Sequence, residues 1–296
     1  ESDGSFLKLA PILAVVTNID REHLDHYADL NQILAAFTEF VNKVPFYGAA
    51  ILCIDDENVQ RILPLVKRRM ITYGANAQAD LRISHATAGH LSSEFRLTRG
   101  TQDLGLFRLN VPGSHNISNA AAAAAIALEL DIPVEAIREG LAQFAGVDRR
   151  FQIKGNERGV TVIDDYGHHP TEVRATLEAA RACNYANIHV LFQPHRYTRT
   201  QALMDEFARA FHQADSVQVL DIYAASELPI EGITSQALVD RLRTYGHRGA
   251  HYAASMDAGV AAVCRAATSG DAIITLGAGS VSQAGPAILE QLRSAQ

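Results

Sequence analysis

Short apolar runs alternate with segments of helical length along most of this chain. The runs occur at residues 12–17, 49–54, 70–73, 160–163, 188–192, 216–220, 250–252 and 272–276. The segments between them include 30–44, 59–66 and 171–181, which read as helices. Alternation of this kind predicts β-α-β units, that is, parallel sheets covered by helices. We therefore expect an α/β fold.

The pattern changes twice, which divides the chain of 296 residues into two parts. Residues 80–111 show the alternation and the turn residues of an antiparallel meander. Two helices are expected next, at 117–130, with Ser114 as N-cap, and at 134–144. Residues 146–151 interrupt the pattern. A chain of this length favours two domains, and we place them at 1–148 and 149–296.

Composition and charge argue against several classes of protein. The formal net charge is -7, whereas a nucleic-acid partner calls for a basic stripe. No apolar run is long enough to span a bilayer. The three cysteines, Cys53, Cys183 and Cys264, are scattered along the chain, which suggests free thiols in a reducing compartment. We therefore expect a cytoplasmic protein without a nucleic-acid or membrane partner.

Two polar turns carry most of the ionisable groups of the second domain. The first, Asp164-Asp165-Tyr166-Gly167-His168-His169-Pro170-Thr171-Glu172, follows an apolar strand and opens a helix. The second, Gln193-Pro194-His195-Arg196-Tyr197-Thr198-Arg199-Thr200, follows the next strand. If the two strands are adjacent, both turns lie at the carboxyl edge of the sheet, where ligands bind. Imidazoles, guanidiniums and carboxylates gathered there suit an anionic substrate or a phosphoryl group. The alternative is a buried polar network, but burying so many ionisable groups is costly.

Four further motifs allow two readings each. The turn Gly277-Ala278-Gly279-Ser280 offers backbone amides to an anion, although a tight turn is the commoner explanation. His115, Asn116 and Asn119 share the first turns of a helix, where they can contact an adenine edge or cap the helix. Arg149 and Arg150 suit phosphate oxygens or form a solvated charge pair. Glu1 and His23 are candidate metal ligands, but they do not make a full coordination set, and spacing alone favours a surface loop histidine at His23.

Together these motifs resemble the Mur ligases. The resemblance rests on segments that follow one another in the family's order: Glu1-Ser2-Asp3, Asn18-Ile19-x-x-x-His23-Leu24-Asp25, His115-Asn116-x-x-Asn119-Ala120, Arg149-Arg150-Phe151 and the two long polar turns. It implies the remainder of a central ATPase-type domain, with a parallel sheet and a small antiparallel sheet. A Rossmann-like C-terminal α/β domain is expected to follow.

The resemblance also implies an activity, which is ATP-dependent amide-bond synthesis through an acyl phosphate. The two long turns favour the family member that joins L-alanine to UDP-N-acetylmuramate in peptidoglycan precursor synthesis. By the same resemblance, Glu1 and His23 would bind Mg²⁺, and His115, Asn116 and Asn119 would hold the adenine of ATP. Arg149 or Arg150, together with Asp164, would contact the phosphate and ribose ends of the nucleotide. The amino-acid pocket and the acyl-phosphate end would be lined by Tyr166, His168, His169, Arg196 and Arg199.

Departures from the family leave other functions open. The chain has no G-x-x-x-x-G-K-[ST] motif, no UDP-sugar-binding domain ahead of residue 1, and no lysine around residues 37–39. We therefore expect this chain to be inactive by itself. Its uncovered sheet edge and apolar surface predict either poor stability or homo-oligomers. The alternatives are a recycling ligase that adds a tripeptide to the same UDP-sugar, and a non-catalytic module derived from a Mur ligase.

Overall fold

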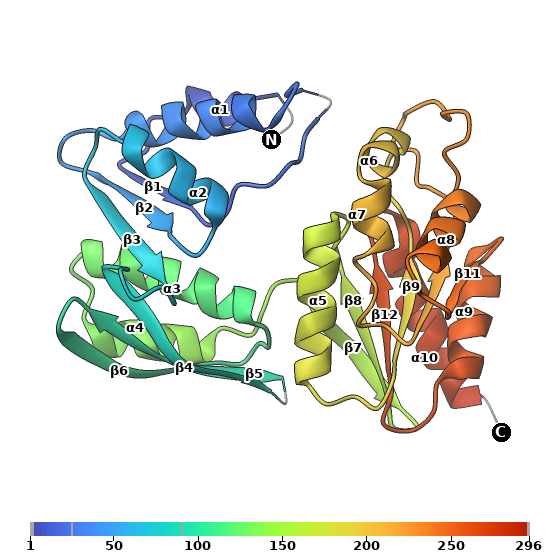
Figure 1. The fold of residues 1–296 in the computed structure, drawn as a ribbon. Helices are drawn as coiled ribbons and strands as arrows, with labels where there is room; N and C mark the ends of the chain where they lie inside the picture. The colour runs from blue at the N-terminus through green and yellow to red at the C-terminus, as the bar shows by residue number, and fades with distance from the viewer. Residues whose placement is uncertain (1–2, 25, 90, 295–296) are drawn as a thin grey trace. The chain divides into compact units, whose positions relative to one another are not determined.

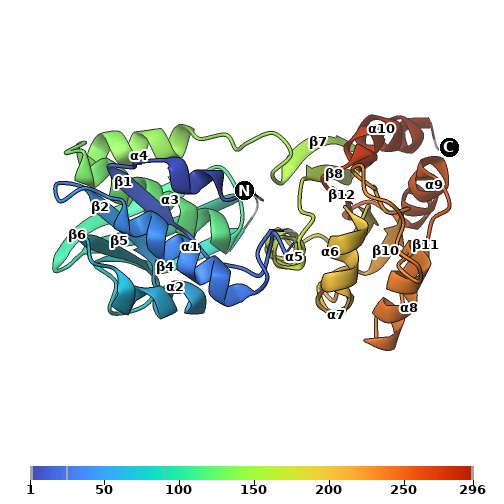
Figure 2. The same ribbon diagram turned by 90° about the horizontal axis from the view of Figure 1, so that it is seen from above.

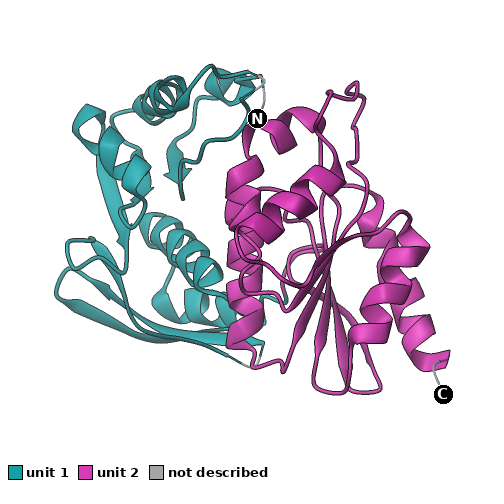
Figure 3. Ribbon diagram, turned by 45° about the vertical axis from the view of Figure 1, so that its right-hand side comes forward, with its two compact units in different colours: residues 1–145 teal, residues 146–296 magenta. Residues whose placement is uncertain are grey.

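The computed structural model describes residues 3–24, 26–89 and 91–294. The chain forms two compact units, Glu1–Ala145 and Gly146–Gln296, which are coloured separately in Figure 3. Each unit contains one six-stranded sheet with helices packed against it, as expected for an α/β fold. We describe the two units one after the other.

The first unit has the strand order β1-β2-β3-β4-β5-β6. The strands are β1 (Leu13–Val16), β2 (Ala49–Cys53), β3 (Met70–Gly74), β4 (Leu81–Gly89), β5 (Ser92–Arg99) and β6 (Gln102–Leu109). β1 to β4 pair in parallel, and β4 to β6 form the expected antiparallel meander. A short parallel pairing of β3 with β4 joins the two parts, so they form one continuous sheet.

Helices cover both faces of this sheet (Figure 1). They are α1 (Leu30–Asn42), α2 (Glu57–Ile62), α3 (Ser114–Glu129) and α4 (Val134–Gln143), with 3-10 turns at Ser5–Lys8 and Leu63–Leu65. Ile33 and Val41 of α1 pack with Leu52 of β2 in one core. On the opposite face, the alanines of α3 pack with Phe95 and Phe107 in a second core.

The predicted N-cap of α3 is wrong. Ser114 is the first residue of the helix, and its side chain is exposed. Gly113 takes the N-cap position with φ 102°, a conformation that residues with a Cβ rarely adopt. The glycine therefore sets where this helix begins.

The second unit has the strand order β11-β10-β9-β12-β8-β7. The strands are β7 (Gln152–Glu157), β8 (Val160–Asp165), β9 (Ile188–Phe192), β10 (Ser216–Val219), β11 (Ala250–Tyr252) and β12 (Ala272–Leu276). All pair in parallel except β7, an antiparallel edge strand that we did not predict. The helices are α5 (Pro170–Ala182), α6 (Tyr197–Ala202), α7 (Met204–Ala208), α8 (Ser235–Thr244), α9 (Met256–Ala266) and α10 (Ala284–Ser294), with a 3-10 turn at Ser280–Gln283.

Two layers of helices cover the second sheet (Figure 2). α9 and α10 lie on one face, where Val263 and Ile288 pack with Ile273 of β12. α5, α7 and α8 lie on the other face, and Phe192 of β9 contacts Phe207 there with ring centroids 5.6 Å apart. The three cysteines are free, as expected. Among the described residues, no helix has both the length and the apolar character needed to cross a bilayer.

Candidate active site

Three loops of the second unit meet at the carboxyl edge of its sheet. They follow β8, β9 and β12, whose last residues lie side by side, because Leu276 pairs with both Asp165 and Phe192. The two polar turns therefore share one edge, as expected. The assumption that β8 and β9 are neighbours is wrong, since β12 lies between them (Figure 1). This insertion brings the turn at residues 277–280 between the two polar turns.

Arg149 is held by the first polar turn and by the loop after β12. Its Nε donates to Oδ2 of Asp164 at 3.3 Å, and its Nη2 donates to the carbonyl oxygen of Gly277 at 2.6 Å. The side chain of Asp164 is 2% exposed, and its Oδ1 accepts the hydroxyl of Thr275 at 2.6 Å. The predicted nucleotide contacts Arg149 and Asp164 thus form an ion pair with each other.

Tyr166 lies against both predicted arginines. The guanidinium carbon of Arg149 is 4.8 Å from its ring centroid and that of Arg150 is 5.5 Å away. The backbone N–H of Tyr166 donates to the carbonyl oxygen of Arg149 at 2.7 Å. Arg149 has φ 60°, so this contact holds a residue in a conformation that is uncommon for side chains with a Cβ. The result is a cationic surface with an aromatic ring at its centre.

Asp165 shapes the turn rather than facing a ligand. Its two carboxylate oxygens accept the backbone N–H groups of Phe151 and Gly167, each at 2.7 Å. Burial raises the pKa of Asp165, although these two N–H groups act to lower it. A Cβ on Gly167 would lie 2.8 Å from Oδ1 of Asp165, so the turn requires glycine there.

His168 is oriented by Glu172. The Oε2 of Glu172 accepts the backbone N–H of His168 at 2.9 Å and lies 3.3 Å from its Nδ1. Burial alone would raise the pKa of Glu172, but His168 and the guanidinium of Arg150 lower it below its usual value. The Nδ1 of His168 is also 3.1 Å from the carbonyl oxygen of Tyr166. Because both neighbours are acceptors, we assign the proton of a neutral His168 to Nδ1.

His169 caps helix α5. Its Nδ1 accepts the backbone N–H of Thr171 at 3.4 Å, and its own N–H donates to Oε2 of Glu172 at 3.2 Å. The bond to Glu172, together with a bond from the backbone N–H of Glu172 to the His169 side chain, forms a capping box, and His169 is 4% exposed. The sequence prediction of a catalytic His169 did not include this helix-capping role.

His195 stands next to His168 and is held neutral. The two ring centroids are 5.7 Å apart, and the ring of Tyr223 stacks on His195 at 5.5 Å with an interplanar angle of 14°. Burial lowers the pKa of His195 to about 4, and the positive charges of Arg199 and Arg196 act in the same direction. The Nη1 of Arg199 lies 3.2 Å from Nδ1 of His195. A guanidinium only donates, so Nδ1 is the acceptor and Nε2 carries the proton.

The loop after β12 packs against Gln193. The Oε1 of Gln193 accepts the backbone N–H of Val281 at 3.1 Å, and its Nε2 donates to Oγ of Ser280 at 3.2 Å. A Cβ on Gly277 would lie 2.7 Å from the carbonyl oxygen of Gln193, and one on Gly279 would overlap its Oε1. These close approaches favour the tight-turn reading of the glycine motif.

Sequence reasoning did not single out Tyr223 and Glu227. Both lie in the loop after β10, at the same carboxyl edge. The Oε1 of Glu227 accepts the hydroxyl of Thr198 at 2.6 Å, so this loop is bound to the second polar turn. A signal was available: β10 was predicted at 216–220, and the carboxyl ends of parallel strands are where site residues are expected.

The predicted adenine contacts and metal ligands lie in the first unit, which is built on the other sheet, and they are far from this cluster in sequence. Asn116 donates to the carbonyl oxygen of Pro112 at 2.7 Å, a contact local to the start of α3, and Asn119 is exposed. His115 lies on the same turn.

The proposed magnesium ligands lie elsewhere in the first unit. His23 lies in the loop after β1 with φ 54°, and Glu1 falls outside the described residues. Among residues 3–24, 26–89 and 91–294, no group of three or more His, Cys, Asp or Glu side chains is arranged to hold a metal ion. The magnesium site therefore stays a prediction.

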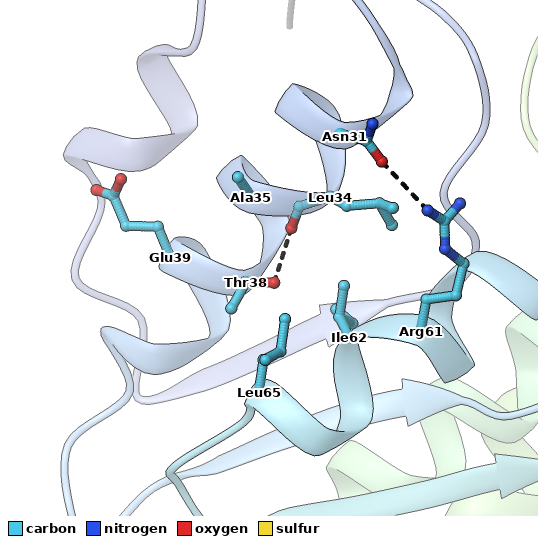
Figure 4. Close-up of a pocket in the computed structure, with 8 residues that line it drawn as sticks. All are labelled: Asn31, Leu34, Ala35, Thr38, Glu39, Arg61, Ile62 and Leu65. Atoms are coloured by element: carbon cyan, nitrogen blue, oxygen red, sulfur yellow. Dashed lines mark hydrogen bonds between the residues drawn. The ribbon is translucent and has the colours of Figure 1, made fainter.

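A groove on the first unit contains none of the predicted site residues. It lies between α1 and α2, with Leu34, Ile62 and Leu65 on its walls (Figure 4). Arg61 at one end donates to Asn31 at 3.2 Å. The groove is largely apolar and has no cluster of ionisable groups, so we do not place the chemistry there.

Comparison with known proteins identifies related domains and relatives. The model of the Mur ligase middle domain matches residues 2–127, and that of the Mur ligase glutamate ligase domain matches residues 149–279. A UDP-N-acetylmuramate–L-alanine ligase of Solibacter usitatus is 64% identical over 294 residues, which are 99% of this chain and 62% of that protein. One of Acidobacterium capsulatum is 56% identical over 295 residues, 99% of this chain and 64% of that protein.

A solved structure matches both units. The crystal structure of the UDP-N-acetylmuramate-alanine ligase of Thermotoga maritima superimposes with a TM-score of 0.78 at 25% sequence identity. The match covers 100% of this chain and 63% of the other. The chain thus spans a little less than two thirds of the length of the relatives that it matches.

Proposed function

Since the chain belongs to the Mur ligase family, we propose that the protein joins L-alanine to UDP-N-acetylmuramate in an ATP-dependent step of peptidoglycan precursor synthesis. The observation that carries this proposal is the cluster at the carboxyl edge of the second sheet. Tyr166 and His168 come from one turn, and His195, Arg196 and Arg199 from another. The named relatives supply the substrates.

The reaction would require crowded negative charge to be neutralised. The substrate carboxylate attacks the γ-phosphorus of ATP, and the bond between this phosphorus and the β-phosphate oxygen breaks. The products of this step are ADP and an acyl phosphate. The amine of L-alanine then attacks the acyl carbon and phosphate departs. Arg196 and Arg199 suit both the carboxylate of L-alanine and the acyl phosphate, because a guanidinium binds such groups through paired hydrogen bonds. Magnesium, when bound, would neutralise phosphate charge, with His23 and Glu1 as its proposed ligands.

The two histidines suit different tasks. His195 is neutral and carries its proton on Nε2, so it would donate a hydrogen bond to an anionic oxygen. His168 keeps its proton on Nδ1 toward Tyr166 and Glu172, which leaves Nε2 as the acceptor nitrogen. We propose that this nitrogen receives the proton that the ammonium group of L-alanine must lose before it attacks. His115, Asn116 and Asn119 remain the proposed adenine contacts.

Phosphate release tests the function. The complete product of the reading frame is mixed with ATP, Mg²⁺, UDP-N-acetylmuramate and single amino acids, and we expect stimulation by L-alanine above all others. Stimulation by a tripeptide that begins with L-alanine and γ-D-glutamate, without stimulation by L-alanine, would instead indicate the recycling ligase. Absence of any heat on titration with ATP and Mg²⁺ would indicate a non-catalytic module.

A further inference from the structure

The turn that carries His195, Arg196 and Arg199 begins a helix that lacks its own cap. Helix α6 has six residues, and its N-cap, Arg196, makes no side-chain capping bond. Arg196 also has φ 71°, which is unfavourable for a residue with a Cβ. The first N–H groups of a helix need partners from elsewhere when the N-cap side chain supplies none. A helix this short is also too short to be stable by itself.

Glu227 supplies the missing partner from a different loop. Its Oε2 accepts the backbone N–H of Thr198 at 3.0 Å, and its Oε1 accepts the hydroxyl of the same residue at 2.6 Å. The Nη1 of Arg196 lies 4.0 Å from Oε1. The side chain of Glu227 is only 19% exposed, so solvent competes weakly for these contacts.

The backbone fixes where Glu227 sits. Arg196 N–H donates to the carbonyl oxygen of Tyr223, and Tyr223 N–H donates to that of Pro194, both at 2.8 Å. The parallel pairing of β9 with β10 is thereby extended beyond the ends of both strands. Ala225 and Ser226 then adopt φ 47° and 72°, and this turn closes with a bond from Glu227 N–H to Ala224. Two successive left-handed residues cost energy, which the contacts of this loop must offset.

We propose that Glu227 is a positioning residue for the amino-acid site, which caps helix α6 across the gap between two loops and so holds Arg196 and Arg199 toward the substrate. The proposal rests on the proposed function, since it assigns these arginines to L-alanine. Through Thr198, Glu227 fixes the turn in which Arg199 reaches His195. The negative charge of Glu227 also attracts the guanidinium of Arg196, whose Nη1 lies 4.0 Å from Oε1.

Two variants of Glu227 and one matched control test this role in the complete protein. Glu227→Ala removes both bonds to Thr198, whereas Glu227→Gln keeps an acceptor oxygen for the N–H. The control is Asp80→Ala, because Oδ2 of Asp80 accepts the N–H and the hydroxyl of Thr72 in the same way, each at 2.8 Å, far from the cluster in sequence. Any general effect of losing such a carboxylate appears in the control as well.

We expect two results for Glu227→Ala. Backbone hydrogen exchange over residues 196–202 becomes at least tenfold faster. The reason is that a hydrogen bond to a charged acceptor stabilises the closed state of the helix by at least a factor of about ten. The KM for L-alanine rises about tenfold, while the affinity for ATP, measured by calorimetry, changes less than twofold. Glu227→Gln restores most of the exchange protection, and Asp80→Ala alters neither quantity.

Either of two outcomes overturns the proposal. Unchanged exchange in Glu227→Ala would mean that the carboxylate does not cap the helix. Faster exchange with an unchanged KM for L-alanine would mean that the contact is structural only. Failure of the proposed function looks different: L-alanine would not stimulate phosphate release by the parent protein, whereas the exchange measurement would still report on the cap.

Discussion

Acidification should destabilise the protein through His195. The pKa of this histidine is lowered from 6.5 to about 4 in the folded protein, because burial and the neighbouring positive charges disfavour the imidazolium. Between these values the unfolded chain binds a proton that the folded chain does not. The stabilisation is therefore complete above about pH 6.5 and is lost as the pH falls toward 4.

The size of the effect follows from the two pKa values. If the whole pKa shift contributes, lowering the pH from 7 to 5 reduces the free energy of unfolding by about 1.8 kcal/mol. His195 is only partly buried, so solvent screening reduces this figure, and we expect a loss of about 1 kcal/mol. The guanidiniums of Arg199 and Arg196 come from the same turn as His195, and their charges disfavour a further positive charge on its imidazole.

Urea unfolding at pH 7 and pH 5 measures this loss, with His195→Gln as the reference. The sequence has no tryptophan, so far-ultraviolet circular dichroism serves as the signal. Between pH 7 and pH 5, the free energy of unfolding of the unsubstituted protein should fall by about 1 kcal/mol more than that of His195→Gln. In an NMR titration, the imidazole resonance of His195 is the one that disappears from the spectrum of His195→Gln. Its chemical shift should remain that of a neutral imidazole down to pH 5. A midpoint near 6.5 for that resonance, or equal losses for the two proteins, would refute the reasoning.

Three further substitutions test other parts of the site, and a fourth, on helix α4, is a control. Arg196→Lys keeps the charge but loses the planar pair of donors, so kcat/KM for L-alanine should fall about tenfold with an unchanged circular dichroism spectrum. Gly279→Ala should destabilise the protein by about 1–3 kcal/mol in urea, because the new methyl group would overlap Oε1 of Gln193. Gly140→Ala is its control: no atom lies within 4 Å of the added Cβ on helix α4, and stability should rise by about 0.5–1 kcal/mol. Asp164→Ala should cost about 2 kcal/mol or more, since it leaves a partly buried guanidinium without its carboxylate, and thermal melting would detect that loss.

Two central strands of the second unit, β9 and β12, could be predicted well because every residue in them is buried. Both have the bounds expected from the sequence. The edge strand β11 also has the expected bounds, although two of its three residues are exposed. A strand covered by helices on both sides is a continuous apolar run, which stands out between polar turns. β7 was missed for the opposite reason. Its sequence, Gln152–Glu157, contains one large apolar residue, and its strand conformation comes from pairing with β8 at the sheet edge.

The active-site candidates were predictable only as far as they follow strands in sequence. Tyr166, His168, His195, Arg196 and Arg199 stand in two turns of distinctive composition. Residues that support them do not have such a context. Glu227 sits in a loop without a recognisable motif, and it is brought to Thr198 by two backbone bonds that extend the pairing of β9 with β10. Such support is visible only when the loops are seen side by side.

The position of β12 decided what the sequence left open about the glycine turn. The last strand in sequence is inserted between β8 and β9, a non-local arrangement that no local pattern encodes. The insertion presses the turn after β12 against Gln193, where a Cβ on Gly277 would come within 2.7 Å of a carbonyl oxygen. The N–H of Val281 is used by Gln193 rather than offered to an anion. Glycine is thus required here by close packing of two loops, and Arg196 and Arg199 remain the proposed contacts of an acyl phosphate.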